Sequence, residues 1–119
     1  LTRIHLMIKN FMAIHDVHDD EAAEAYKSYF REMHADTVTH GEWAKTTVGE
    51  FATAIQVWQG RNSNFYCTHF QAVSEDHVYK QLGAWGMDRF FNSMVIETER
   101  FTSALLPEDE EIDKTYFRE

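Results

Sequence analysis

The chain has 119 residues, a net charge of −9 and 44% hydrophobic residues. This length and composition suit one folded domain and exclude a largely disordered chain, and the negative charge argues against nucleic-acid binding. The single cysteine, Cys67, excludes an internal disulfide and a thiolate metal cluster. There is neither an apolar run of membrane-helix length nor a signal peptide in residues 1–10, so we expect no membrane insertion and a cytoplasmic location.

The first expected elements are a strand and an amphipathic helix. Ile4, Leu6 and Ile8 alternate with polar neighbours, which predicts a strand over residues 2–12. Asp19 or Asp20 is then expected to cap a helix of about four turns. The apolar face of that helix repeats at steps of three and four, through Ala22, Tyr26, Tyr29, Phe30 and Met33.

Further elements follow at regular intervals. Trp43, Ala44 and Val48 either continue the first helix or form a short second one. Residues 51–59 and 65–72 are rich in β-branched and aromatic residues around a five-residue Gly/Asn turn, which predicts a β-hairpin. A helix capped by Ser74 and a last strand over residues 92–98 complete the pattern. The apolar face of that helix carries Val78, Leu82 and Trp85.

This order predicts an α+β, ferredoxin-like βαββαβ fold, with a four-stranded antiparallel sheet covered by helices on one face. Each strand nevertheless carries apolar residues on both sides, so the second sheet face would be an unusually large exposed apolar patch. A second copy that packs sheet to sheet would bury it, and we therefore expect a homodimer that forms an α/β barrel.

The C-terminal residues differ in composition from the rest of the chain. We expect a ferredoxin-like domain over 1–101 and an acidic extension over 102–119. The extension is either a solvated tail or a short helix that begins at Pro107 and docks on a neighbouring subunit through Ile112, Tyr116 and Phe117.

The element order, the two apolar sheet faces and the stretch Gly-Met-Asp-Arg-Phe-Phe-Asn at 86–92 resemble the dimeric α/β-barrel superfamily over roughly residues 2–101. The chain is similar to small, uncharacterised dimeric ferredoxin-like proteins of microbial origin in that superfamily. The resemblance implies a pocket between the helices and the sheet of each subunit. It also implies a choice of activities, because the superfamily includes cofactor-independent monooxygenases, haem-degrading monooxygenases, lactone isomerases and members without known activity.

Two helical stripes and the first strand are expected to enclose a compartment between helices and sheet. It is either an ordinary filled core or an elongated apolar pocket with polar groups at one end. Asn10, His40 and the Tyr26 or Tyr29 hydroxyl would form that polar end, and Asn10, His40 and Tyr29 are the catalytic candidates. The predicted pocket comprises Ile8, Asn10, Tyr26, Tyr29, Phe30, Met33, His40, Leu82 and Trp85.

Metal and haem sites are alternatives. His15 and His18 lie among three aspartates within six residues, and imidazole suits Zn, Ni or Cu, although a solvated capping loop is the competing interpretation. Resemblance to the haem-degrading branch implies an Asn on the first strand, a Trp and a His. Asn10 matches the first by position, whereas Trp58 and His77 do not stand where that branch has its Trp and His.

The main function we expect is binding of a small apolar ligand, acyl-chain-like or aromatic with a carbonyl or carboxylate head, by a homodimer without a cofactor. The first alternative is a cofactor-independent monooxygenase or isomerase, in which a His or Tyr moves a proton while Asn10 polarises a carbonyl or holds oxygen. The second alternative is a His-rich metal or haem binder. Whether the protein is an enzyme stays open.

Overall fold

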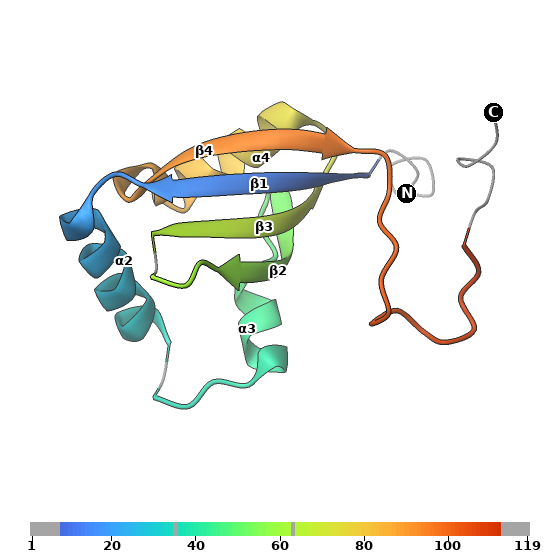
Figure 1. Cartoon of the computed structure of the whole chain (residues 1–119), viewed down its shortest axis with the longest axis horizontal. Coiled ribbons are helices and arrows are strands. Elements are labelled where there is room, and N and C mark those ends of the chain that lie inside the picture. The colour runs from blue at the N-terminus through green and yellow to red at the C-terminus, as the bar shows by residue number, and fades with distance from the viewer. Residues whose placement is uncertain (1–7, 35, 63, 113–119) are drawn as a thin grey trace.

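The computed structural model describes residues 8–34, 36–62 and 64–112. Four strands, three α-helices and one 3₁₀ turn follow one another along the chain (Figure 1). They are β1 (Lys9–Val17), α2 (Asp20–Met33), α3 (His40–Thr46), β2 (Ala52–Gln59), β3 (Phe65–Ala72), α4 (Glu75–Ala84), η1 (Met87–Arg89) and β4 (Phe91–Thr98).

The four strands form one antiparallel sheet in the order β2-β3-β1-β4. The two central strands, β1 and β3, are therefore adjacent, and the last strand pairs with the first, as in a ferredoxin-like arrangement. This confirms the predicted α+β class. Helix α3 is the short second helix that was one of the two options for Trp43 and Ala44.

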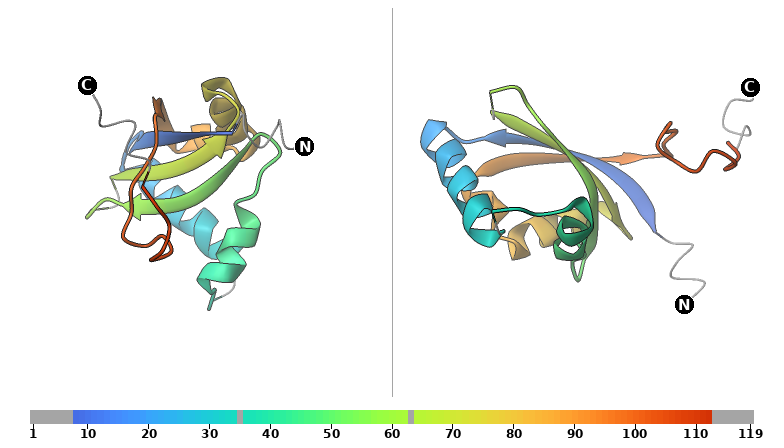
Figure 2. Two further views of the ribbon diagram at one scale, coloured as in Figure 1. Left: turned by 90° about the vertical axis from the view of Figure 1, so that its right-hand side faces the viewer. Right: turned by 90° about the horizontal axis from the view of Figure 1, so that it is seen from below.

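All three helices lie on the same side of the sheet (Figure 2). The core between them and the strands is built around buried Phe11, Ala13 and Val95 from the sheet and Val78 and Leu82 from α4. Burial of each larger side chain contributes about 1.5–3 kcal/mol, so this layer is the main source of stability. None of the helices in the described ranges has both the length and the apolar character that crossing a bilayer takes.

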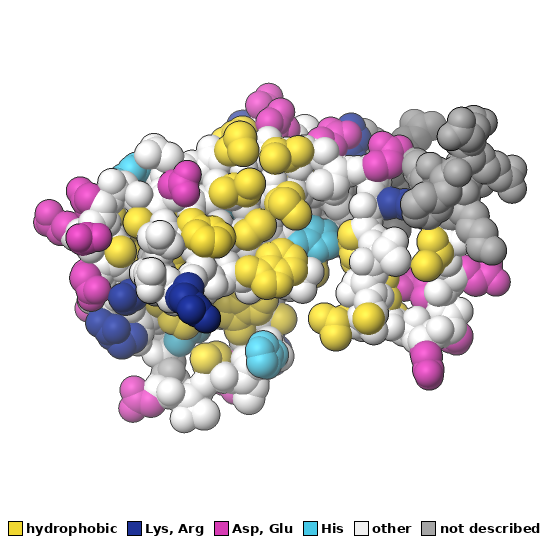
Figure 3. Space-filling view, in the orientation of Figure 1, with side chains coloured by type: hydrophobic (Ala, Val, Ile, Leu, Met, Phe, Trp, Pro, Cys, Tyr) yellow, Lys and Arg dark blue, Asp and Glu magenta, His cyan; other side chains and the backbone are white. Residues whose placement is uncertain are grey.

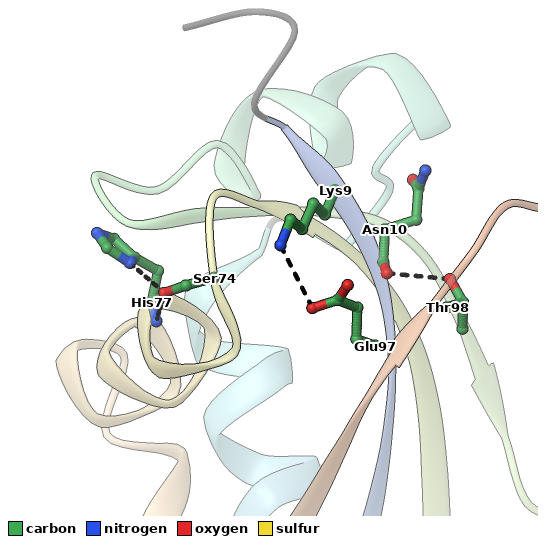
Figure 4. Close-up of polar contacts among 6 residues, drawn as sticks. All are labelled: Lys9, Asn10, Ser74, His77, Glu97 and Thr98. Atoms are coloured by element: carbon green, nitrogen blue, oxygen red, sulfur yellow. Dashed lines mark hydrogen bonds and ion pairs between the residues drawn. The ribbon is translucent and has the colours of Figure 1, made fainter.

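The helix starts agree with the sequence signals. Asp19 is the N-cap of α2, and its Oδ1 accepts a hydrogen bond of 2.7 Å from the backbone N–H of Ala22. Ser74 caps α4 in the same way, because its Oγ accepts from the backbone N–H of His77. Such caps contribute about 1 kcal/mol each. In Figure 4, a second contact joins Ser74 Oγ to the His77 ring.

The first strand is displaced from its predicted position. Strand β1 runs over Lys9–Val17 rather than over residues 2–12, and residues 1–7 lie outside the described part of the chain. Two backbone ladders explain the extension, because β1 pairs along its length with both β3 and β4. His15 consequently belongs to a strand and not to the expected capping loop.

The face of the sheet away from the helices is strongly apolar, and we call it the open face. Strand pairing brings its side chains into cross-strand rows, and Met94 and Trp58 in one row are each about half exposed. Figure 3 shows hydrophobic side chains gathered over the strands on this face. The apolar side chains of the open face are Met12, Ile14, Trp58, Phe65, Cys67, Met94 and Ile96.

The C-terminal extension is described as far as residue 112 and contains no helix in that range. The helix start predicted at Pro107 is instead a turn, closed by a 3.0 Å hydrogen bond from the Glu110 N–H to the Pro107 carbonyl. Tyr116 and Phe117, which were expected to lie on a docking helix, are outside the described residues. Ile112, the third residue of that face, is half exposed.

Candidate functional site

A cavity of about 130 Å³ lies between the helices and the covered face of the sheet. It is partly open to solvent, and its wall is mostly aromatic and aliphatic. A cavity of about 150 Å³ holds one benzene molecule, so this one accepts a group of roughly that size. Its lining comprises His15, Tyr26, Tyr29, Phe30, Met33, His34, Trp43, Thr46, Thr47, Ala54, Val57, Tyr66, Thr68, Phe70, Leu82, Trp85, Met87 and Phe91.

Tyr26 is the central aromatic residue of one wall. Its ring meets those of Tyr66, Phe90 and Phe91 edge to face, with centroids 4.8–5.4 Å apart, which is the favourable geometry for aromatic pairs. Burial raises the pKa of Tyr26 to about 12, and the neighbouring Tyr66 and Tyr29 act in the same direction. The phenol therefore stays neutral at physiological pH and can donate a hydrogen bond.

The polar end of the cavity wall is a buried histidine clamped between two hydroxyl groups. His15 on β1 is 4% exposed; its Nδ1 lies 2.7 Å from Ser93 Oγ and its Nε2 lies 3.0 Å from Thr68 Oγ1. The three residues stand side by side on neighbouring strands. Burial lowers the pKa of His15 to about 4, against a smaller opposing effect of the Asp16 carboxylate. The imidazole is therefore neutral, and both its nitrogens are already engaged.

The cavity opens into a wider groove of about 940 Å³ between α2, α3 and β2. The two share five lining residues, so the groove continues from the mouth of the cavity. The shared residues are Tyr26, Phe30, Trp43, Val57 and Tyr66. Partly buried Lys27 and exposed Arg31 and His40 also line the groove, together with Leu105 from the C-terminal extension.

The structure brings most of the predicted pocket residues together. Six of them line the cavity, and His40 lines the adjoining groove. The six are Tyr26, Tyr29, Phe30, Met33, Leu82 and Trp85. Ile8 and Asn10 are not among the lining residues of either space. In β1, Phe11, Ala13 and His15 point toward the helices, so Asn10 faces the opposite side.

Asn10 is part of a polar cluster at one end of the open face. Its Oδ1 accepts hydrogen bonds from His69 Nε2 at 2.8 Å and from Gln71 Nε2 at 3.2 Å. Its backbone carbonyl accepts from the Thr98 hydroxyl, as Figure 4 shows. The ring of Phe101 packs on His69, and burial lowers the pKa of that histidine. Asn10 thus takes part in hydrogen bonds between strands and does not face the cavity.

The metal and haem alternatives find no assembled site in the described ranges. No group of three His, Cys, Asp or Glu side chains comes together there. His15 is held by two hydroxyls, and the ring of His18 contacts the Asp88 backbone carbonyl. Trp58 lies on the open face, whereas the His77 ring contacts Ser74 at the start of α4, so the two are not in one pocket. Burial raises the pKa of the Cys67 thiol, which makes it a poor nucleophile.

Sequence reasoning missed His15, Thr68, His34 and Trp43 as lining residues. Thr68 lies in the strand predicted over 65–72, but its partner Ala13 and also His15 lie beyond the strand predicted over 2–12, so the correct bounds and pairing of β1 would have been needed to find them. His34 and Trp43 come from the end of α2 and from α3, and their positions depend on how the connecting segment folds back over the sheet.

Comparison with known proteins identifies no family. The chain matches no family model and no curated protein. Among solved structures it is similar to the crystal structure of PA3566 from Pseudomonas aeruginosa, with 14% sequence identity and a TM-score of 0.44. The match covers 80% of this chain and 95% of that one. A similarity at this level does not identify a function.

Proposed function

We propose that the protein is a homodimer of the dimeric α/β-barrel type that binds a small apolar ligand with a carbonyl or carboxylate head. The cavity beneath the sheet is the observation that carries the proposal, because an open, mostly apolar space with few polar groups is typical of ligand sites. Its volume limits the apolar part of the ligand to a single ring or a short acyl chain.

The polar head of the ligand is assigned to the groove rather than to the inner end of the cavity. At the inner end, His15 and Thr68 already satisfy each other, and Ser93 engages the second imidazole nitrogen. A head group placed there would break these hydrogen bonds without replacing both of them. In the groove, His40 and Arg31 are exposed and accessible to a ligand, and Lys27 beside them is partly buried.

Substitution of Val57 by Trp tests the ligand site. Val57 lines both the cavity and the groove and is 42% exposed, so a larger side chain there blocks the mouth without overpacking the core. We expect Val57→Trp to abolish binding of benzamide, measured by ligand-observed NMR. The matched control is Val48→Trp, at an exposed position outside both linings, which keeps binding. Equal binding by both variants, or none by the wild type, contradicts the proposal.

Native mass spectrometry of freshly purified protein gives independent information about the ligand. A co-purifying mass of small-molecule size that is absent from Val57→Trp identifies the natural ligand directly. A mass that persists in Val57→Trp binds elsewhere and counts against this cavity.

The dimer is proposed from the size of the open face. Four strands about 4.8 Å apart, each about eight residues long, make a face of roughly 500 Å². Two copies packed through it bury on the order of 1,000 Å², which reaches the lower limit of a specific interface. The apolar rows lie across the centre of the face, where a two-fold axis would pair them with the same rows of a second copy, and the polar cluster lies at one end.

A charge on the open face tests the dimer. Met94→Lys is expected to convert a species of twice the 14.0 kDa chain mass into a monomer, measured by size-exclusion chromatography with light scattering. Val48→Lys adds the same charge at an exposed site away from the sheet face and leaves the dimer intact. A wild-type monomer at micromolar concentration rules the dimer out.

An enzyme remains the second candidate, and the observation in its favour is His34. This residue ends α2, lines the cavity and is only half buried, with its ring against Phe30. It is therefore better placed than Asn10 to move a proton on a bound carbonyl compound. Exchange of the methyl protons of acetophenone with deuterated water, followed by NMR, should be faster than in buffer and slower in His34→Gln. Exchange at the buffer rate excludes this proton transfer.

A further inference from the structure

The charge distribution around the groove differs from that of the rest of the molecule. The chain carries −9 overall, yet among the described residues that line the cavity or the groove there is no Asp or Glu. The Lys, Arg and His side chains that do line these spaces are Lys27, Arg31, His15, His34 and His40. A site with this composition in an acidic protein favours an anion over a cation or a neutral molecule.

Arg31 is the groove residue best suited to bind that anion. Its Nη2 donates a 3.3 Å hydrogen bond to Ser28 Oγ, and in the described part of the chain no carboxylate lies within ion-pair distance of it. A guanidinium carries five N–H donors, whose fork matches a carboxylate in two parallel hydrogen bonds. Most of that capacity is unused in Arg31.

Lys27 and His40 complete the charged edge of the groove. Lys27 lies one turn before Arg31 on α2, and its Nζ is 3.2 Å from Glu24, so its charge is already partly neutralised. His40 begins α3 on the other side of the groove. In Figure 3, Lys and Arg side chains lie near α2, and a His side chain lies near α3.

The cavity fixes the size of the group to which the anion is attached. Phe30 lines both the cavity and the groove, and Arg31, the next residue in α2, lines the groove. A ligand whose ring contacts Phe30 and whose anionic group contacts Arg31 therefore occupies both spaces. The cavity volume of about 130 Å³ corresponds to one six-membered ring, and its aromatic wall offers edge-to-face contacts to such a ring.

We propose that the ligand class is the single-ring aromatic carboxylates, with the ring in the cavity and the carboxylate in the groove against Arg31. This inference rests on the proposed ligand site and adds the charge and ring number of the ligand. Because Arg31 is exposed, its contribution is modest and depends on salt.

Benzoate and benzamide test the inference, because they share ring and shape and differ in charge. In titrations followed by NMR at low ionic strength, we expect benzoate to bind about three- to tenfold more tightly than benzamide, because its carboxylate makes an exposed, charge-assisted contact with Arg31. At about 0.5 M salt the preference should fall to nearly one. Arg31→Gln should also bring the ratio of the two affinities to about one. Arg61→Gln, which removes the same charge from the β2–β3 turn outside the groove, should retain the wild-type preference.

The outcomes separate this inference from the ligand site itself. If benzamide binds in the cavity and benzoate binds no more tightly, or if Arg31→Gln retains the full preference, the carboxylate assignment is overturned while the site stands. If neither compound binds, or if both bind equally well to Val57→Trp, the site itself is wrong.

Discussion

The clamped histidine should make the stability of the fold depend on pH in a defined window. His15 has a pKa of about 4 in the folded chain because of its burial, against 6.5 as its ordinary value. The unfolded chain therefore binds more protons between these two values, so the free energy of unfolding decreases as the pH falls from about 6.5 to about 4 and is independent of this residue above that range. For one such group the expected loss is about 2 kcal/mol at pH 5 and approaches 3 kcal/mol at pH 4.

Urea unfolding followed by tryptophan fluorescence at about pH 8 and about pH 5 measures this loss, at one fixed protein concentration because a dimer adds its own dependence. His15→Gln keeps hydrogen-bonding capacity toward Ser93 and Thr68 but does not titrate, so it should lose about 2 kcal/mol less than the wild type over this interval. His40→Gln, at an exposed site, controls for the removal of any histidine. An identical pH dependence in wild type and His15→Gln would refute the assignment of a neutral, buried imidazole.

Three further substitutions test local features of the fold by the same unfolding measurement. Gln81 is 3% exposed and its Oε1 accepts from the N–H groups of Phe51 and Ala52, so Gln81→Leu should cost about 2–3 kcal/mol, and a cost below about 0.5 kcal/mol would contradict this anchoring role. Gly49→Ala should cost about 1–3 kcal/mol because its new Cβ would collide with the anchored Gln81 amide; a neutral effect would show that the amide can move away. Asp19→Ala should cost about 1 kcal/mol through loss of the α2 cap, whereas Asp19→Asn, which can also cap, should retain most of the stability.

The fold was largely predictable because each element carries its own local signal. Asp19 and Ser74 cap the helices that follow them, and the turn after Gln59 joins two strands of matching length. Whether Trp43 continued the first helix or belonged to a short second one could not be decided from the sequence, because a helix of seven residues is too short to show a clear periodic pattern. The extension after residue 101 was harder still, because Pro107 followed by acidic residues is compatible with both a helix start and the turn that forms.

The cavity was predictable in its helical part and not in its strand part. The aromatic residues of α2 recur at helical spacing along one face of the helix, so Tyr26 and Phe30 could be assigned to the cavity from the sequence. The strands are apolar on both sides, and alternation alone does not say which side meets the helices. In β2 a register shift between Ala54 and Gln56 adds to the difficulty, since it brings Val57 to the face on which Ala54 lies.

The position of β1 decides which polar side chain faces the cavity, and the sequence holds one clue to that position. Residues 11–17 offer two alternating sets: one ends in His15 and Val17, the other in Ile14 and Asp16. Turning the second set inward would bury the Asp16 carboxylate under the helices, which costs far more than burying an imidazole that can become neutral and meet two hydroxyls. The cost of burying Asp16 therefore favours the orientation of β1 in which His15 faces the cavity and Asn10 faces the opposite side of the sheet. Because His15 is then fully satisfied by its own sheet, the proposed ligand site has to select its head group in the groove, through the basic side chains there.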